Sequence, residues 1–346
     1  MKRRRLLGQL CGASTIGALA GCTGTVFGDD TYRNPVYEPI LADPSVVRTE
    51  DGTYYAYGTE DDWGDCEGAR IAPIVRSENL VDWEYVGEAF ERKPDWKNLG
   101  FIWAPDVVRY RNRYYLYYSY SEWGDENPGI GVATADDPIG PFEDHGKLFS
   151  SEEIGVENSI DPVFHVHEET PYLIWGSFHG IYGVELTEDG LGWVDDTRFH
   201  VAGDAYEAPY LLEREGYYYL FVTTGSCCEG HSSTYELEVG RAESFDGPYE
   251  NQDGDDLRTI DAWNSGDPIV SASDRFAGPG HNSTIADESG TEWLLYHAYD
   301  TTANEYECDD FPRRSLLLDR IEWEEGWPTV DDGTPSEEAT VPDVDA

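Results

Sequence analysis

The sequence predicts an all-β fold, a β-propeller of five blades, on three observations. Aromatic-rich runs with alternating polarity recur five times along the chain. Each run follows an apolar run across a polar or glycine-containing turn, which is the pattern of a β-hairpin. No long segment has the 3.6-residue apolar period of an amphipathic helix.

Each unit begins with an apolar strand that has a similar opening signal. The signals are ADPSVV from residue 42, WAPDVV from 103, IDPVFH from 160, EAPYLL from 207, and GHNSTI from 280, which lacks the proline. Proline suits the first residue of a strand because no ladder hydrogen bond is lost there. The units are separated by 61, 57, 47 and 73 residues when anchored at Asp43, Ala104, Asp161, Ala208 and His281. About 60 residues per unit predicts four strands per blade.

The aromatic run supplies the second strand of each hairpin. The runs are Thr53–Gly58, Arg113–Tyr118, Pro171–Gly176, Tyr217–Val222 and Glu292–His297. Aromatic and β-branched residues fit a pleated, half-buried surface, so these runs favour strands over helices. We expect the propeller to occupy residues 36–330.

The two ends of the chain are predicted to lie outside the propeller. Residues 1–21 combine a basic start, an Arg-Arg-x-Leu-Leu pattern and a short apolar stretch before Cys22, which is typical of a twin-arginine lipoprotein signal peptide. The apolar run is far shorter than the roughly 20 residues that span a bilayer. We expect export to the outer face of the cell membrane or secretion, with membrane contact only through a lipid anchor at Cys22. Residues 22–35 would be a tether and residues 331–346 an acidic disordered tail.

The charge balance restricts the possible partners. Lys and Arg number 23 against 70 Asp and Glu, giving a formal net charge of −47, so nucleic acids and anionic membranes would be repelled. The acidic residues are spread evenly and only four of the cations are lysines, which is typical of a surface kept soluble in high salt. We expect a halophilic protein that is a monomer.

Six cysteines require placement. Cys11 leaves with the signal peptide, and four remain beside the lipid-bearing one: Cys66, Cys227, Cys228 and Cys308. They allow up to two disulfides in an oxidising compartment, in three connectivities. A bridge between neighbouring cysteines needs a strained ring, so we favour pairing of Cys227 or Cys228 with distant Cys66 or Cys308, or free buried thiols. The spacing matches no zinc motif.

Propeller geometry brings the openings of the five first strands together at one end of the central channel. The converging residues, at or just before the proline, are Asp43, Trp103, Asp161, Glu207 and His281. Three converging carboxylates raise one another's pKa and lose hydration, an arrangement that usually serves a function. Two carboxyl groups across a groove with aromatic walls suit glycoside hydrolysis, one as proton donor and one as the base that activates water.

These motifs resemble glycoside hydrolase family 43, five-bladed propeller enzymes that act on arabinose- and xylose-containing polysaccharides, and most closely its endo-1,5-α-L-arabinanase branch. The resemblance runs from about Tyr37 to Trp327. It is carried, in order, by DPSVV (43–47), DWEYVG (82–87), WAPDVV (103–108), YYLYYS (114–119), IGVATA (130–135), NSIDPVF (158–164), EAPYLL (207–212), YYYLFVTTGSCCEGHSSTYELEVGRAESFDGPY (217–249) and GPGHNS (278–283).

The resemblance implies inverting hydrolysis of α-1,5-L-arabinofuranosidic bonds in arabinan, with no organic cofactor. By position it assigns Asp43 as the general base, Glu207 as the general acid, and Asp161 as the carboxylate that raises the pKa of the acid and orients it. It assigns His281 to one hydrated cation, commonly Ca²⁺, in the central channel. Inversion would require roughly 6.5–9.5 Å between the carboxyl groups of acid and base.

Four residues are candidates for the sugar groove. Trp103, Phe178 and His179 are expected to wall it, and Asn158 to bond a sugar hydroxyl; a core role is the alternative for Trp103. The arabinanases resembled here usually carry Gly-Ser-Phe-Trp where this chain reads GSFHG from Gly176. His179 could therefore shorten a long-chain cleft, or indicate a subgroup that releases single arabinose units.

Two other functions compete with endo-acting hydrolysis. An exo-acting α-L-arabinofuranosidase or β-xylosidase would share the three carboxylates and differ in the loops that block one end of the cleft. A non-catalytic surface glycan-binding propeller would be indicated by loss of a carboxylate, and all three are present. The expected partner is a polysaccharide or oligosaccharide substrate.

Overall fold

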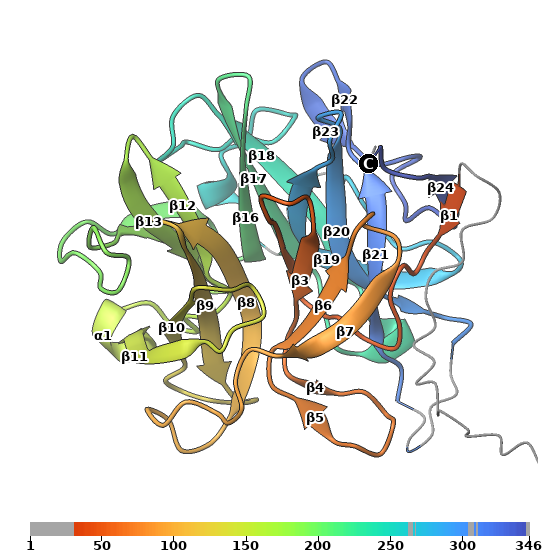
Figure 1. Ribbon diagram of the computed structural model, residues 1–346. Coiled ribbons are helices and arrows are strands. Elements are labelled where there is room, and N and C mark those ends of the chain that lie inside the picture. Colours follow the sequence, from red (N-terminus) through yellow and green to blue (C-terminus); the bar gives the residue numbers. More distant parts are fainter. Residues whose placement is uncertain (1–30, 262–265, 267, 304–307, 309–310, 344–346) are drawn as a thin grey trace, which may run out of the picture.

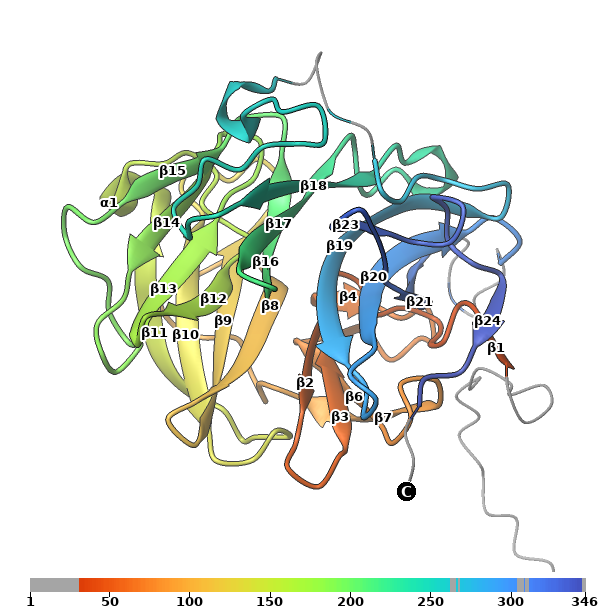
Figure 2. The same ribbon diagram turned by 90° about the horizontal axis from the view of Figure 1, so that it is seen from above.

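The computed structural model describes residues 31–261, 266, 268–303, 308 and 311–343. Five antiparallel sheets surround a common centre (Figures 1 and 2), which confirms the predicted all-β five-bladed propeller. Within each of these sheets, every strand is hydrogen-bonded to the strand that follows it in the blade. The other elements are a short helix α1 (Ser151–Ile154), two 3₁₀ turns and small hairpins, β4 (Asp61–Asp62) with β5 (Ala69–Arg70) and β22 (Glu322–Glu324) with β23 (Trp327–Thr329).

Blades 1 to 3 have four strands each. Blade 1 contains β2 (Ser45–Arg48), β3 (Tyr54–Tyr57), β6 (Pro73–Ser77) and β7 (Trp83–Glu88). Blade 2 contains β8 (Phe101–Tyr110), β9 (Arg113–Ser121), β10 (Gly129–Ala135) and β11 (Glu143–Ser150). Blade 3 contains β12 (Val163–His167), β13 (Thr170–Trp175), β14 (Ile181–Glu185) and β15 (Phe199–Ala202).

Blades 4 and 5 have three strands each within the described residues, which corrects the expectation of four. Blade 4 contains β16 (Glu207–Arg214), β17 (Tyr217–Thr224) and β18 (Glu236–Ala242), and blade 5 contains β19 (Phe276–Ala286), β20 (Glu292–Asp300) and β21 (Arg314–Arg320). Irregular segments cover both outer edges. Glu250 bridges to Arg241 of β18, and Tyr37 bridges to Leu316 of β21.

The first strand of every blade lies innermost. Strands β2, β8, β12, β16 and β19 contact one another around a closed ring, and Figure 2 shows them around the centre of the molecule. Each aromatic run forms the second strand of its blade, so the hairpin pairing read from the sequence is correct.

All five repeat anchors share one unusual backbone conformation. The left-handed φ values are 53°, 42°, 58°, 53° and 47° at Asp43, Ala104, Asp161, Ala208 and His281. Such angles cost a non-glycine residue roughly 1 kcal/mol or more, so the surrounding structure must hold them. In β8, β16 and β19 the register with the second strand also shifts at the anchor. A bulge of this kind re-aims the neighbouring side chains, here at the opening of the channel.

Hydrogen bonds from the preceding blade hold four of these anchors. A polar side chain near the end of the second strand accepts the backbone N–H of the next anchor. These bonds join Asp43 to His297, Ala104 to Thr59, Asp161 to Ser119 and His281 to Thr223, at 3.1, 2.8, 2.9 and 3.1 Å. Blade 4 is the exception, because Ser177 donates instead to the Glu207 carboxylate at 2.6 Å. The amide of Ala208 bonds the carboxyl of Asp161.

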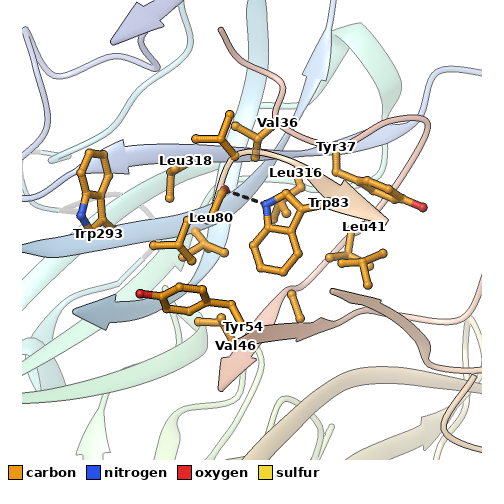
Figure 3. Close-up of a cluster of buried hydrophobic side chains, with 14 of the residues drawn as sticks. Val36, Tyr37, Leu41, Val46, Tyr54, Leu80, Trp83, Trp293, Leu316 and Leu318 are labelled. Atoms are coloured by element: carbon orange, nitrogen blue, oxygen red, sulfur yellow. Dashed lines mark hydrogen bonds between the residues drawn. The ribbon is translucent and has the colours of Figure 1, made fainter. Parts of the chain in front are cut away.

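The core consists of apolar layers between adjacent blades. Figure 3 shows the layer that joins blade 1 to blade 5, where Trp83 donates from Nε1 to the Leu80 carbonyl at 2.7 Å. Val36 and Tyr37 from the start of the described chain pack in this layer against Leu316 and Leu318 of β21. The ring is therefore closed by side chains from both ends of the sequence.

The termini differ from the prediction. Thr31–Arg33 forms β1, which pairs with β24 (Glu338–Thr340). The fold therefore extends beyond residues 36–330 at both ends, into the predicted tether and the predicted tail, where the two short strands satisfy each other's backbone groups. The signal peptide and Cys22 lie outside the described residues. Among those described, no helix is long and apolar enough to cross a membrane.

The disulfide pairing is also a correction. Cys66 bonds Cys308, and Cys227 bonds its neighbour Cys228. The distant pairing expected for Cys227 or Cys228 fails because ring closure brings the loops of blades 1 and 5 together, with the Cys308 amide 3.0 Å from the Gly64 carbonyl.

Candidate active site

The three predicted carboxylates meet at the opening of the channel. Asp43, Asp161 and Glu207 are only 8%, 7% and 7% exposed. Asp43 lies close enough to both of the others to raise their pKa. The left-handed anchors place these side chains: Asp43 and Asp161 are anchors themselves, and Glu207 directly precedes the anchor Ala208.

Positively charged and polar groups surround Asp43. Its Oδ1 accepts a hydrogen bond from Arg314 Nη1 at 2.9 Å and lies 3.2 Å from Nδ1 of His297 and 3.4 Å from Nδ1 of His281. The Thr59 hydroxyl donates to Oδ2. Burial alone would raise the pKa of Asp43, but Arg314 and the two histidines outweigh it and hold the pKa well below its usual range. Asp43 is therefore ionised at neutral pH.

His297 is neutral beside this carboxylate. Burial, then Arg314, lower the pKa of His297 to about 4. Its Nδ1 accepts the backbone N–H of Asp43 at 3.1 Å, so the proton of the neutral ring belongs on Nε2. The imidazole thus fixes the backbone of Asp43 as well as facing its side chain.

Neutral donors and apolar surroundings hold Glu207. Ser177 Oγ donates to Oε2 at 2.6 Å, and the Tyr235 phenol donates to Oε1. Burial raises the pKa of Glu207 to about 7, although both of these hydrogen bonds act in the opposite direction. Glu207 can therefore carry a proton at neutral pH and release it.

Asp161 and Glu207 form a coupled pair. Burial, then the charges of Glu207 and Asp43, raise the pKa of Asp161 well above its usual range. Ionisation of either member penalises ionisation of the other, so the two carboxyls hold a proton between them at neutral pH. The site thus combines one ionised carboxylate with one proton-holding pair, which is what acid–base displacement requires.

The predicted groove residues surround this centre in different ways. Trp103 is partly exposed, which favours the groove over a core role, and its ring lies parallel to that of Phe101 and 5.5 Å from that of Trp123. Phe178 is 37% exposed. His179 is exposed, with Nδ1 3.3 Å from Glu157 Oε2. Its polar ring pairs with a surface carboxylate rather than covering the centre.

Asn158 reaches the centre through Ser177. Its Nδ2 donates to the carbonyl and the hydroxyl of Ser177 at 3.1 and 2.9 Å. Because this hydroxyl then donates to Glu207, Asn158 orients the hydrogen bond to the carboxyl group. Its amide nitrogen is thus engaged by Ser177.

Sequence reasoning missed the partners of the carboxylates. They are Thr59, Ser177, Tyr235, His297 and Arg314. Three of them, Thr59, Ser177 and His297, occupy one repeat position, so alignment of the five aromatic runs could have found them. Tyr235 lies in the segment 217–249 that carries the resemblance but has no counterpart in the repeat, and no sequence signal marks Arg314.

The predicted cation site at His281 is compatible with a hydrated ion only. Within the described residues no three His, Cys, Asp or Glu side chains are grouped to hold a metal ion directly. The side-chain amide of Asn282, the hydroxyl of Ser283 and Nε2 of His297 are buried, and they have no hydrogen-bond partner among the described residues. Ordered water would satisfy such groups, and water is also the shell through which a single histidine could hold Ca²⁺.

The chain is similar to known proteins along most of its length. The family model described as Glycosyl hydrolases family 43 matches residues 32–328. The chain is 31% identical to an extracellular endo-α-(1→5)-L-arabinanase of Bacillus subtilis, over 84% of this chain and 87% of that protein. It is 30% identical to an extracellular exo-α-(1→5)-L-arabinofuranosidase of Cellvibrio japonicus, over 84% and 86%.

Solved structures agree as well. The structure of Cellvibrio cellulosa α-L-arabinanase complexed with arabinohexaose superposes with a TM-score of 0.72 at 28% identity, over 85% of this chain and 96% of that one. A family 43 endo-arabinanase from Bacillus licheniformis gives a TM-score of 0.70 at 29% identity, over 84% and 97%.

Proposed function

The chain belongs to glycosyl hydrolases family 43, and from that premise we propose that it is an inverting enzyme that cleaves α-1,5-L-arabinofuranosidic bonds in arabinan. The observation that carries the proposal is the opposite protonation of two buried carboxyl groups. Arg314 keeps Asp43 ionised, whereas burial keeps a proton on the pair of Glu207 and Asp161.

Hydrolysis then proceeds in one displacement. A water molecule gives a proton to Asp43 as its oxygen bonds the anomeric carbon, while the bond from that carbon to the leaving O5 breaks. Glu207 gives its proton to O5, so the leaving sugar departs as an alcohol. Among the described residues, Oδ2 of Asp43 accepts one hydrogen bond, from Thr59, and keeps a lone pair for the proton, whereas Oδ1 faces Arg314 and two histidines.

The roles of the flanking groups follow. Asp161 keeps the proton of Glu207 in place until the leaving oxygen takes it, and Trp103 offers its exposed ring to a sugar. His281 would hold a hydrated Ca²⁺, whose charge would further favour ionised Asp43. Export by a twin-arginine route, with an anchor at Cys22, is consistent with the extracellular relatives.

Product analysis tests the proposal. Debranched arabinan is incubated with the full chain in high salt, and the products are sized by chromatography while proton NMR follows the first anomer released. We expect oligosaccharides of inverted configuration. Absence of hydrolysis on this substrate would remove the arabinan assignment, and retained configuration would remove the single-displacement mechanism.

The alternative is exo-action, which the similarity to the Cellvibrio exo-acting enzyme favours. It predicts arabinose as the sole early product from the same digestion. An aryl β-xyloside tests the xylosidase form, and binding of arabinan without hydrolysis would indicate a glycan-binding propeller.

A further inference from the structure

The side chain of Tyr235 connects the surroundings of the acid Glu207 with those of the base Asp43. Its hydroxyl donates to Oε1 of Glu207, while its ring stacks on His297 with centroids 5.8 Å apart and an interplanar angle of 16°. His297 in turn contacts the side chain and the backbone amide of Asp43. One buried side chain therefore touches the acid directly and the base through a single ring.

A glycine makes room for this ring. A Cβ on Gly280 would lie 2.4 Å from Cδ2 of Tyr235 and 2.6 Å from Cγ2 of Thr223. Gly280 is also the cross-strand partner of His297 in the pairing of β19 with β20. The Tyr235 ring thus fills the space that the missing side chain leaves, directly beside the imidazole.

We propose that Tyr235 is a positioning residue for this reaction, which fixes the carboxyl of Glu207 with its hydroxyl and supports His297 behind Asp43 with its ring. The inference rests on the proposed glycosidase function. Tyr235 is 2% exposed, so it acts through these neighbours and not through the substrate.

The hydroxyl has a measurable effect on the acid. The titratable and charged groups that face Glu207 are Asp161, Asp43, Arg314 and Tyr235. Among them Tyr235 donates a hydrogen bond that stabilises the ionised carboxylate and so lowers the pKa of Glu207. Removal of this donor must raise that pKa, since the burial that opposes it remains.

The variant Tyr235→Phe keeps the stacked ring and removes only the hydroxyl. We expect the alkaline limb of the kcat/KM profile on arabino-oligosaccharides to move up by about one pH unit, because one charge-assisted hydrogen bond is lost. The acidic limb, set by Asp43, stays in place. We also expect kcat to fall by about tenfold, because the acid is less well oriented, with KM little changed.

Tyr206→Phe is the matched control. Tyr206 is a buried tyrosine directly before Glu207 in the sequence, and its hydroxyl donates to Glu238 at 3.0 Å instead of to the site. This variant loses a comparable hydrogen bond and should leave both limbs where they are. If both variants shifted the alkaline limb equally, general loosening of blade 4 would explain the effect and the proposal would fall.

Site-specific 3-fluorotyrosine at position 235 provides a second test that preserves the fold. The more acidic phenol donates a stronger hydrogen bond, so the alkaline limb should move down, opposite to the phenylalanine variant. An alkaline limb unmoved in both Tyr235 variants overturns the proposal. The wild-type chain is assayed beside them, so its inactivity on arabinan would count against the proposed substrate rather than against Tyr235.

Discussion

Asp43 and Glu207 are equally buried at the same end of the channel, yet their surroundings push their pKa values in opposite directions. Blade 5 supplies a guanidinium and two imidazoles to Asp43, whereas blades 3 and 4 supply two hydroxyls and a second carboxyl to Glu207. Partners therefore decide the protonation state where burial alone would make both groups neutral.

The comparison also separates two kinds of hydrogen bond. Asp43 accepts from the permanent cation Arg314 as well as from the neutral hydroxyl of Thr59, and Arg314 with the two histidines outweighs desolvation. The donors to Glu207 are neutral hydroxyls, which only reduce the effect of desolvation. A cationic partner keeps a buried carboxyl group ionised, as a general base must be, whereas neutral partners leave it protonated, as a general acid must be.

Removal of either proton-transfer group should abolish hydrolysis. Asp43→Asn and Glu207→Gln each keep the side-chain volume and should lower kcat on arabinan by about 10³- to 10⁴-fold, measured by reducing-sugar release. Glu207→Gln should recover in part on aryl arabinosides, whose leaving group needs no proton. Glu215→Gln, an exposed change on the same hairpin as Glu207, is the control, and an Asp43→Asn variant with most of its activity would contradict the base assignment.

Loss of Arg314 should make the surroundings of Asp43 resemble those of Glu207, because no permanent cation would then oppose the effect of burial. In Arg314→Leu the pKa of Asp43 rises, so the base stays protonated to higher pH and the acidic limb of the pH–rate profile moves up by about one to three units. Chemical denaturation should show a loss of about 3–5 kcal/mol, because Asp43 becomes an unpaired buried charge.

The control for Arg314→Leu is Arg109→Leu, which breaks an exposed ion pair with Glu50 and should cost at most about 1 kcal/mol with no shift of either limb. An acidic limb that did not move in Arg314→Leu would show that the histidines alone keep Asp43 ionised.

Asp161→Asn should remove the effect of Asp161 on the ionisation of Glu207. The amide cannot ionise and no longer penalises ionisation of Glu207, so the pKa of Glu207 falls and the alkaline limb moves to lower pH. The acidic limb moves much less. A covalent glycosyl intermediate trapped on Asp161 would contradict both this role and inversion.

Salt should change the stability of the acidic protein more than it changes the ionisation of the buried carboxyl groups. With a net charge of −47, self-repulsion destabilises the fold in dilute buffer, and we expect molar KCl to raise Tm by several degrees in calorimetry. The limbs of the pH–rate profile should move less, because the buried carboxyls are screened little. A Tm independent of salt would contradict the halophilic interpretation.

The repeat explains what the sequence could predict. The opening signals located Asp43, Asp161 and Glu207, and the aromatic runs located the second strands, because both patterns are local and recur in every blade. Thr59, Ser177 and His297 share one position of that repeat and could have been found in the same way.

Other features depend on contacts that no local pattern records. Arg314 meets Asp43 across 271 residues, and Cys66 meets Cys308 across 242. Thr31–Arg33 and Glu338–Thr340 are short and polar, and form strands only because ring closure places them side by side. The sequence-based boundaries therefore failed at the two ends of the chain.

Ring closure has a consequence for when the enzyme becomes active. The Leu41 amide bonds the Arg314 carbonyl at 3.1 Å, so Asp43 meets its guanidinium only when the first blade docks against the last. Contacts of such sequence separation form late in folding, because their loop-closure entropy must be overcome first. A nascent chain that stops before residue 314 would have its acid assembled and its base unprepared. Hydrolysis therefore reports completion of the whole ring.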